Sequence, residues 1–245
     1  MGSGPLLLFL HGLGGNRHAF DLQFAALSPD YRCVAWDAPG YGDSAPLEEM
    51  TFEKLAESVG SLIEELGETP LAVIGHSFGG MIAQSWLHRG GQCEKLVLAQ
   101  TSAVFGKPGS DWNADFLKAR LEPLDQGATP ADFAKPLIES MFVDTSKREA
   151  IESGIATMSS ISSEQYRRVI QCLVTFDAAD RLQNIDIPTL CLAAQQDKTA
   201  PPANMERMAA TLPNADFVCL KNAGHLAYIE IPEQFNQAIQ QFLEA

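Results

Sequence analysis

Continuous runs of apolar residues alternate along this chain with stretches in which apolar residues recur every three or four positions. The first run, residues 6–10, ends in a glycine-rich turn, which is typical of a strand buried on both faces of a parallel sheet. Further runs of this kind occupy residues 31–36, 71–74, 95–98, 189–193 and 217–220. The pattern therefore predicts a strand at each of these places.

The stretches between these runs have the periodicity of amphipathic helices. In the clearest of them, apolar residues face one side from Phe52 to Leu66, Thr51 precedes them as a helix N-cap, and Gly67 follows at the expected end. Because strands and helices alternate, we expect an α/β fold with a mostly parallel, doubly wound sheet.

The alternation breaks between about residues 103 and 180, where helix-forming residues dominate and no convincing strand occurs. We expect an α/β core formed by residues 1–102 and 181–245, and a helical cap inserted at residues 103–180. The cap has more large apolar side chains than its own helices need for packing. We expect some of them to line an apolar pocket beneath the cap, the alternative being packing within it; the candidates are Trp112, Phe142 and Tyr166.

The composition favours a small-molecule partner. The 245 residues, 46% of them hydrophobic, can bury a substantial core, and the formal net charge of -14 opposes binding to nucleic acid or to an anionic membrane surface. The five cysteines are odd in number and lack CxxC spacing, which indicates reduced packing residues in a cytoplasmic protein. The first apolar run is too short for a signal peptide or a membrane span, so we expect neither export nor membrane insertion.

Residues 75–79 form a G-x-S-x-G sequence directly after a predicted strand and before a predicted helix, residues 81–87. This context is that of a nucleophile on a tight strand-to-helix turn, with its hydroxyl near the positive end of a helix. The sequence therefore predicts Ser77 as a nucleophile. The alternative is a capping serine in a glycine-rich turn.

A serine hydroxyl needs a base, and His225 lies where one is expected, in a loop after the last predicted strand and before a helix beginning near Pro232. For the other four histidines we expect packing or capping roles. A carboxylate must orient the imidazole, and Asp197 follows the preceding strand, which gives the chain order Ser, Asp, His of an α/β-hydrolase. Backbone amides of Leu13 and Phe78 are expected to form an oxyanion hole.

Four segments, in this order and spacing, resemble the α/β-hydrolase superfamily: HGLGG at 11–15, WDAPGYGDS at 36–44, GHSFGG at 75–80 and AGHLAYIEIPEQFN at 223–236. Residues 172–177, 187–188 and 196–202 further resemble 3-oxoadipate enol-lactonases and related small bacterial hydrolases. The resemblance implies two-step acyl transfer through an acyl-enzyme, without a metal or organic cofactor. The short antiparallel hairpin that usually precedes the first strand of the family is missing or shortened here, which exposes a sheet edge and favours lower stability or association; we expect a monomer or a homodimer.

Three functions remain open at this point. The first is hydrolysis of a carboxylic ester or lactone, and the second is cleavage of carbon–carbon bonds in products of aromatic-ring cleavage, which uses the same three residues. The third is a small-molecule receptor on the same fold without useful turnover. An acidic substrate needs a cation in the site, for which Arg17 and Arg120 are the candidates, although each can also be an ordinary surface arginine.

Overall fold

A computed structural model of the chain describes residues 1–106 and 110–245; residues 107–109 of the expected cap lie outside the described part. Six strands form one sheet in the order β2-β1-β3-β4-β5-β6, and every neighbouring pair is parallel. The predicted parallel sheet is confirmed, with strand ends that differ by at most two residues. The strands are β1 (Leu6–Leu10), β2 (Arg32–Ala35), β3 (Ala72–His76), β4 (Lys95–Ala99), β5 (Thr189–Ala194) and β6 (Ala215–Leu220).

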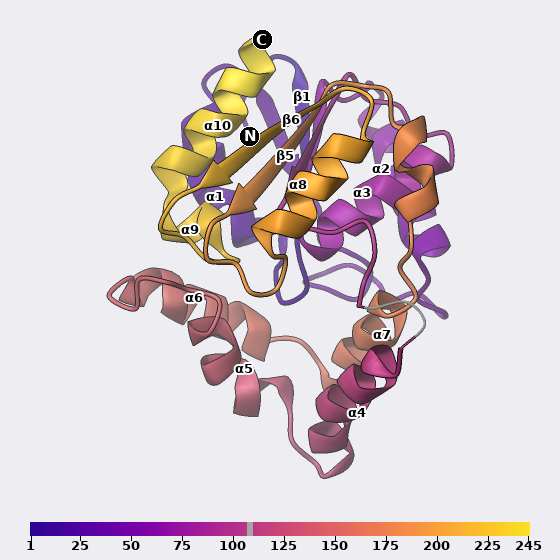
Figure 1. Cartoon of the computed structure of the whole chain (residues 1–245), viewed down its shortest axis with the longest axis vertical. Helices are drawn as coiled ribbons and strands as arrows, with labels where there is room; N and C mark the ends of the chain where they lie inside the picture. Colours follow the sequence, from indigo (N-terminus) through magenta and orange to yellow (C-terminus); the bar gives the residue numbers. More distant parts are fainter. Residues whose placement is uncertain (107–109) are drawn as a thin grey trace.

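Helices cover both faces of the sheet (Figure 1). One face is covered by η1 (Arg17–Phe20), α1 (Asp21–Leu27), α9 (Ala227–Glu230) and α10 (Pro232–Glu244). The other face is covered by α2 (Phe52–Leu66), α3 (Phe78–His88) and α8 (Pro202–Thr211), with the short η2 (Ala179–Asn184) beside α8. The expected doubly wound arrangement is therefore present.

The ends of α2 follow from local chemistry. The Thr51 hydroxyl accepts a hydrogen bond from the Lys54 N–H at 3.2 Å, and Gly67 closes the helix at a φ of 74°. Helix α3 begins at Phe78, three residues earlier than expected, because the Gly80 and Met81 N–H groups already bond the Ser77 carbonyl. The turn at Ser77 is thus directly joined to the first turn of a helix.

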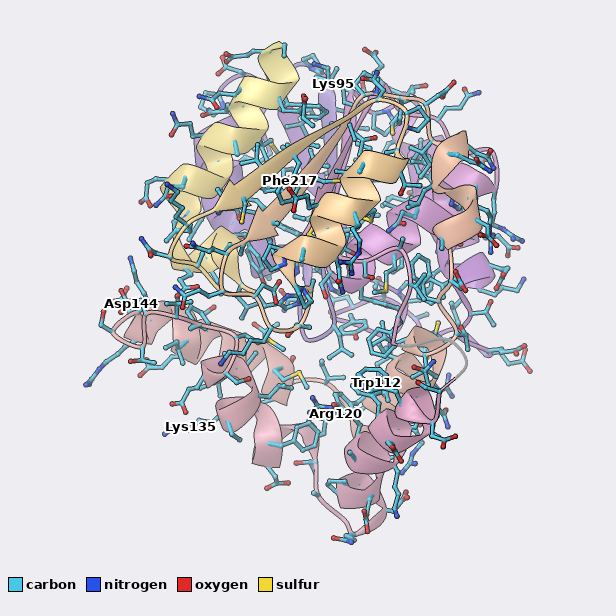
Figure 2. All side chains as sticks on the ribbon, viewed as in Figure 1. Lys95, Trp112, Arg120, Lys135, Asp144 and Phe217 are labelled. Carbon is cyan, nitrogen blue, oxygen red and sulfur yellow. The ribbon has the colours of Figure 1, made fainter. Side chains whose placement is uncertain are left out.

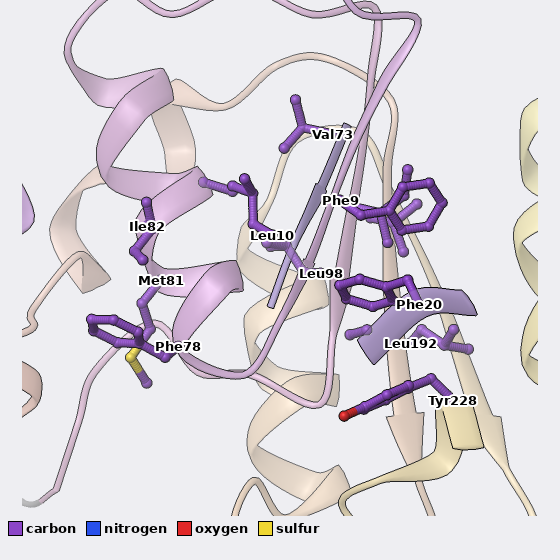
Figure 3. Close-up of a cluster of buried hydrophobic side chains, with 14 of the residues drawn as sticks. Phe9, Leu10, Phe20, Val73, Phe78, Met81, Ile82, Leu98, Leu192 and Tyr228 are labelled. Atoms are coloured by element: carbon purple, nitrogen blue, oxygen red, sulfur yellow. The ribbon is translucent and has the colours of Figure 1, made fainter. Parts of the chain in front are cut away.

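The hydrophobic core lies on both sides of the sheet (Figure 3). On one side, the Phe9 ring of β1 lies 5.1 Å from Phe20, between centroids. On the other side, Phe78 and Ile82 of α3 are both at most 1% exposed. Since strands β1, β3 and β5 are buried along their whole length, the sheet is a rigid base for the loops at its carboxyl edge.

In the described residues between β4 and β5, four α-helices lie beyond the carboxyl ends of the strands (Figure 1). An antiparallel bridge between Val104 and Asp177 joins the two chain segments at the base of this region. The exact division between core and cap stays a prediction. The helices are α4 (Trp112–Asp125), α5 (Pro130–Glu139), α6 (Arg148–Ser159) and α7 (Ser163–Leu173).

Strand β2 forms one edge of the sheet, and no strand precedes β1 in residues 1–106. The Met1 carbonyl accepts a hydrogen bond from the Cys33 N–H, and the Met1 amino group donates to the Cys33 carbonyl, both at 2.8 Å. The outer edge of β2 is therefore paired at one residue. Across the described ranges, no helix is long and apolar enough to cross a membrane.

Two glycines on neighbouring helices give opposite stability predictions. A Cβ on Gly79 would lie 2.0 Å from the Leu10 carbonyl oxygen, whereas a Cβ on Gly60, inside α2, meets only Trp86 Nε1 at 3.9 Å. Overpacking should make Gly79→Ala less stable by about 2–3 kcal/mol. Gly60→Ala should gain about 0.5–1 kcal/mol from helix propensity. Urea unfolding followed by circular dichroism measures both, and equal free energies of unfolding for the two variants would contradict the close contact at Gly79.

Candidate active site

Ser77 occupies the turn between β3 and α3 in a strained conformation. Its φ is 52° and its ψ is -116°, a backbone geometry that costs a non-glycine residue about 1–3 kcal/mol. The Ser77 N–H donates to the Ala99 carbonyl at 2.9 Å, and the Thr101 hydroxyl donates to the Ser77 carbonyl at 2.6 Å. Bonds from the neighbouring β4 segment therefore hold the turn in place.

The structure brings Ser77, His225 and Asp197 into one hydrogen-bonded chain. His225 Nε2 lies 3.0 Å from Ser77 Oγ, and His225 Nδ1 lies 2.8 Å from Asp197 Oδ2. Because the carboxylate can only accept, the imidazole carries its proton on Nδ1 and presents a basic Nε2 to the hydroxyl. The second Asp197 oxygen accepts the Thr199 and Ala200 N–H groups at 2.7 and 2.9 Å, which fixes the carboxylate.

Two further histidines, for which the sequence predicts packing or capping roles, are buried near this chain of groups, and one of them bonds His225. His76 Nε2 donates to the His225 carbonyl at 2.9 Å, and burial lowers the pKa of His76 to about 3. His11 Nδ1 donates to the Gly12 carbonyl, while Nε2 accepts the Ala38 N–H at 3.0 Å. Burial lowers the pKa of His11 to about 4, so both rings are neutral at pH 7.

The two expected oxyanion donors, Leu13 and Phe78, come from the loop after β1 and from the first residue of α3. Leu13 and Phe78 both border the same cavity as Ser77. A Cβ on Gly12 would lie 3.1 Å from the Ser77 Cβ and 2.8 Å from His76 Nδ1, so only a glycine lets the first loop approach this closely. The backbones of both segments therefore lie next to Ser77.

A cavity of about 670 Å³ lies between the sheet edge and helices α4 to α7, with Ser77 and His225 among its lining residues. Three of the candidate substrate residues, Trp112, Tyr166 and Arg120, also line it. Figure 2 shows Trp112 and Arg120 on α4, in the region below the sheet. The wall is largely apolar and includes Leu13, Phe78, Met81, Phe105, Phe116, Leu137, Ile138, Met141 and Ile170.

Two expected pocket residues lie elsewhere, which corrects their assignment. Phe142 is buried at 7% exposure outside the cavity wall, since its loop packs against Gly224, whose Cβ would lie 3.4 Å from the Phe142 Cα. Arg17 is also outside the wall, because its guanidinium binds two carboxylates, Asp37 at 2.8 Å and Asp43 at 2.7 Å. Its charge is therefore paired with carboxylates at the protein surface.

Arg120, unlike Arg17, lines the cavity. Its guanidinium lies 5.5 Å from the centroid of the Phe116 ring, and it forms no ion pair with a carboxylate of the described residues. Burial raises the pKa of the Tyr166 hydroxyl, and the positive charge of the nearby Arg120 opposes that rise. Within the described residues, two basic side chains, Arg120 and Lys198, thus line this largely apolar cavity.

Glu230 is a buried carboxylate that the sequence analysis did not single out. Its exposure is 0%, and its oxygens accept the N–H groups of Val143, Asp144 and Gly224. A glutamate between two isoleucines, at residues 229–231, was the available signal, because a charge in an apolar run needs dedicated partners. In residues 1–106 and 110–245, no group of three or more His, Cys, Asp or Glu is placed to hold a metal ion.

The buried histidines predict a specific acid sensitivity. Burial lowers the pKa of His76 to about 3 and of His11 to about 4, from an ordinary value of 6.5. Between pH 6.5 and pH 4 the unfolded chain therefore binds protons that the folded chain does not, and the free energy of unfolding falls as pH falls. Each histidine adds up to about 1.4 kcal/mol per pH unit to this slope.

We expect His76→Asn to show a shallower slope between pH 6.5 and pH 4, by up to about one proton. Guanidinium unfolding at a series of pH values measures it, with His18→Asn, at a side chain that is 66% exposed, as the control for loss of a histidine. Equal slopes in wild type and His76→Asn would show that His76 is not held neutral by burial.

Comparison with known proteins identifies the family of this chain. A sequence model of the family described as alpha/beta hydrolase fold matches residues 5–232. 3-Oxoadipate enol-lactonase 1 of Acinetobacter baylyi is 26% identical over 98% of this chain and 89% of its own length. Poly(3-hydroxyalkanoate) depolymerase of Ectopseudomonas oleovorans is 30% identical over 98% of this chain and 84% of its own. The structure of a thermophilic esterase from Thermogutta terrifontis has a TM-score of 0.90 at 27% identity, covering 100% of this chain and 91% of the esterase chain. The family model spans most of the sequence, and this chain belongs to the α/β-hydrolase fold family.

Proposed function

We propose that this protein hydrolyses a carboxylic ester or lactone of a small substrate, with Ser77 as nucleophile. The observation that carries the proposal is the hydrogen-bonded chain from Ser77 through His225 to Asp197, 3.0 and 2.8 Å, at a cavity beneath the cap. The enol-lactonase and the esterase among its relatives are named for the same kinds of bond. The geometry and the relatives thus support one reaction class.

In the first step, Ser77 Oγ attacks the substrate carbonyl carbon while His225 Nε2 accepts the hydroxyl proton. The tetrahedral intermediate collapses to an acyl-enzyme, and the imidazolium returns the proton to the departing alkoxide oxygen. Asp197 stabilises the imidazolium and keeps Nε2 directed at the serine. In the second step, water attacks the acyl-enzyme with His225 as base, and the acid product and the Ser77 hydroxyl are released.

The negative charge that develops on the carbonyl oxygen needs fixed donors. The N–H groups of Leu13 and Phe78 would supply them, since both residues border the cavity beside Ser77. The N-terminus of α3 adds a favourable dipole at the same point. Both contributions are built into the backbone and need no side-chain movement during the reaction.

We propose that residues 103–180 act as a cap that shapes the substrate site. Trp112 and Tyr166 contribute apolar wall, and the volume of about 670 Å³ falls within the range typical of small-molecule sites. A wall of this kind suits an acyl or alcohol group of moderate size and excludes water around the ester.

Replacing the nucleophile tests the mechanism. Ser77→Ala should reduce kcat for p-nitrophenyl butyrate by about 10⁴-fold or more, because no other group can form the acyl-enzyme. Labelling by a fluorophosphonate, followed by mass spectrometry, should be confined to Ser77. Ser85→Ala is the matched control, since Ser85 lies on the same helix and its hydroxyl donates to the Phe52 carbonyl. Hydrolysis that survives Ser77→Ala would rule out this mechanism.

A panel of short p-nitrophenyl esters and small lactones also separates the other two functions. Turnover of esters or small lactones by the wild type supports the proposal. Labelling of Ser77 without turnover of any ester or lactone would oppose it. Such a protein would be assigned as a carbon–carbon hydrolase if it cleaved vinylogous diketones, and as a receptor if it bound ligands without cleaving them.

We propose that Arg120 binds a carboxylate of the substrate, at the end distant from the scissile bond. Its guanidinium lines the cavity and forms no ion pair within the described residues. Arg120→Met should lower kcat/KM for mono-p-nitrophenyl glutarate by about 10–100-fold, the value of a charged hydrogen bond, and leave p-nitrophenyl butyrate within about threefold.

Arg167→Met controls for loss of a cap arginine, because Arg167 pairs with Asp125 and lies outside the cavity wall. Equal losses on the charged and the neutral ester in Arg120→Met would show that Arg120 only supports the fold of the cap.

A further inference from the structure

Glu230 ends the short helix α9, five residues after His225, and is fully buried. None of the ion pairs formed by the described residues includes it. Burying a carboxylate without a counter-ion is costly unless hydrogen-bond donors replace the lost water. The positions of those donors therefore show which segments of the chain the Glu230 carboxylate joins.

All three donors that the structure gives Glu230 are backbone N–H groups. Oε1 accepts from Val143 at 2.6 Å and from Asp144 at 2.7 Å, and Oε2 accepts from Gly224 at 2.7 Å. Val143 and Asp144 belong to the cap segment between α5 and α6, where Figure 2 labels Asp144. Gly224 precedes His225 in the chain. One carboxylate thus bridges the cap and the histidine loop.

The backbones of these two segments are also in direct contact. A Cβ on Gly224 would lie only 2.1 Å from the Met141 carbonyl oxygen of the cap, so a glycine is required at this junction. On the other side of the same loop, His76 Nε2 donates to the His225 carbonyl at 2.9 Å. The peptide units around His225 are therefore held from both sides, by Glu230 before it and by His76 after it.

The cap is attached to the core at a second, separate place. On α7, Gln165 Nε2 donates to the Pro39 carbonyl at 2.8 Å, and Arg168 donates to the Leu47 carbonyl. The segment around Val143 can therefore leave the core without detaching the whole cap, and the hydrogen bonds to Glu230 oppose this movement.

We propose that Glu230 is a positioning residue that couples closure of the cap to the placement of His225, an inference that rests on the proposed function. When the segment 143–144 is seated, one carboxylate is saturated by three N–H groups and Gly224 is fixed, which keeps His225 Nε2 at 3.0 Å from Ser77. When that segment lifts, Glu230 loses two donors and is free to hydrate and turn, so the histidine loop loosens. The proton transfer is thereby most efficient over a closed cap.

Glu230→Gln tests this coupling with little change in shape. One carboxylate oxygen becomes an NH₂ group, which cannot accept the N–H groups that faced it. We expect kcat for p-nitrophenyl acetate and the rate of fluorophosphonate labelling of Ser77 to fall together, by about 10–100-fold, with KM for this small ester within about twofold. Glu233→Gln removes the same charge from the exposed first turn of α10 and should match the wild type.

Amide hydrogen exchange supplies a readout that loss of stability alone would not produce. In folded Glu230→Gln, protection should drop at Gly224, Val143 and Asp144, while the amides of β3 and β4 keep the protection set by global unfolding. Wild-type kcat and labelling in a folded Glu230→Gln would overturn the coupling. So would a loss of protection at Val143 and Asp144 that leaves Gly224 unchanged.

If Glu230→Gln does not fold, the wild-type protein still decides the question. A shared carboxylate predicts one opening event, so the three amides should have protection factors within about tenfold of one another. Exchange at Val143 and Asp144 that is more than about 100-fold faster than at Gly224 would overturn the proposal. These results are separable from the proposed reaction, since a wild type that hydrolyses no ester would refute that reaction while exchange and Ser77 labelling still report on Glu230.

Discussion

The close turn at Ser77 is the constraint on which the rest of the site depends. Its φ of 52° is tolerated because bonds from Ala99 and Thr101 hold the turn, and because Gly79 lets α3 pack against the end of β1. The same turn starts α3, whose first amides bond the Ser77 carbonyl. The strained residue Ser77, the N-terminus of α3 and the edge of the sheet therefore form one rigid unit.

The parallel sheet brings together three side chains that lie far apart in the sequence. Ser77, Asp197 and His225 follow β3, β5 and β6, and the carboxyl ends of parallel strands meet at one edge. The loops there need little length to bring the three side chains into a hydrogen-bonded chain. Since the strands beneath are buried, small movements of the loops are resisted by the core.

Buried polar groups lie along this edge, and one of them, Glu230, bonds the segment between α5 and α6. His11 and His76 are neutral and hydrogen-bonded, and Glu230 is satisfied entirely by backbone amides. Each of these groups is costly to bury unless its partners are in place, so each makes the native arrangement of the loops more specific. In this site, the Glu230 carboxylate accepts N–H groups both from Gly224, which precedes His225, and from Val143 and Asp144 between α5 and α6.

The sequence by itself determined the strands, the parallel sheet expected from alternation, the family resemblance and the positions of the candidate nucleophile, base and carboxylate. Each of these features depends on residues that are close together in the chain: runs of apolar residues, a capped helix at 52–66 and short motifs that follow strands. Only the tertiary structure decided which cap residues face the cavity: Trp112, Tyr166 and Arg120 line it, while Phe142 packs beside Gly224.

The sequence also did not predict which distant residues form ion pairs or hydrogen bonds with one another. Arg17 meets Asp37 and Asp43, and Glu230 meets two amides of a segment 86 and 87 residues away, where no periodicity or spacing links the partners. Helical periodicity in the cap indicates an apolar face but not what that face packs against, because the crossing of helices depends on packing between distant segments. Local patterns specified elements and reactive groups, and tertiary packing specified their neighbours.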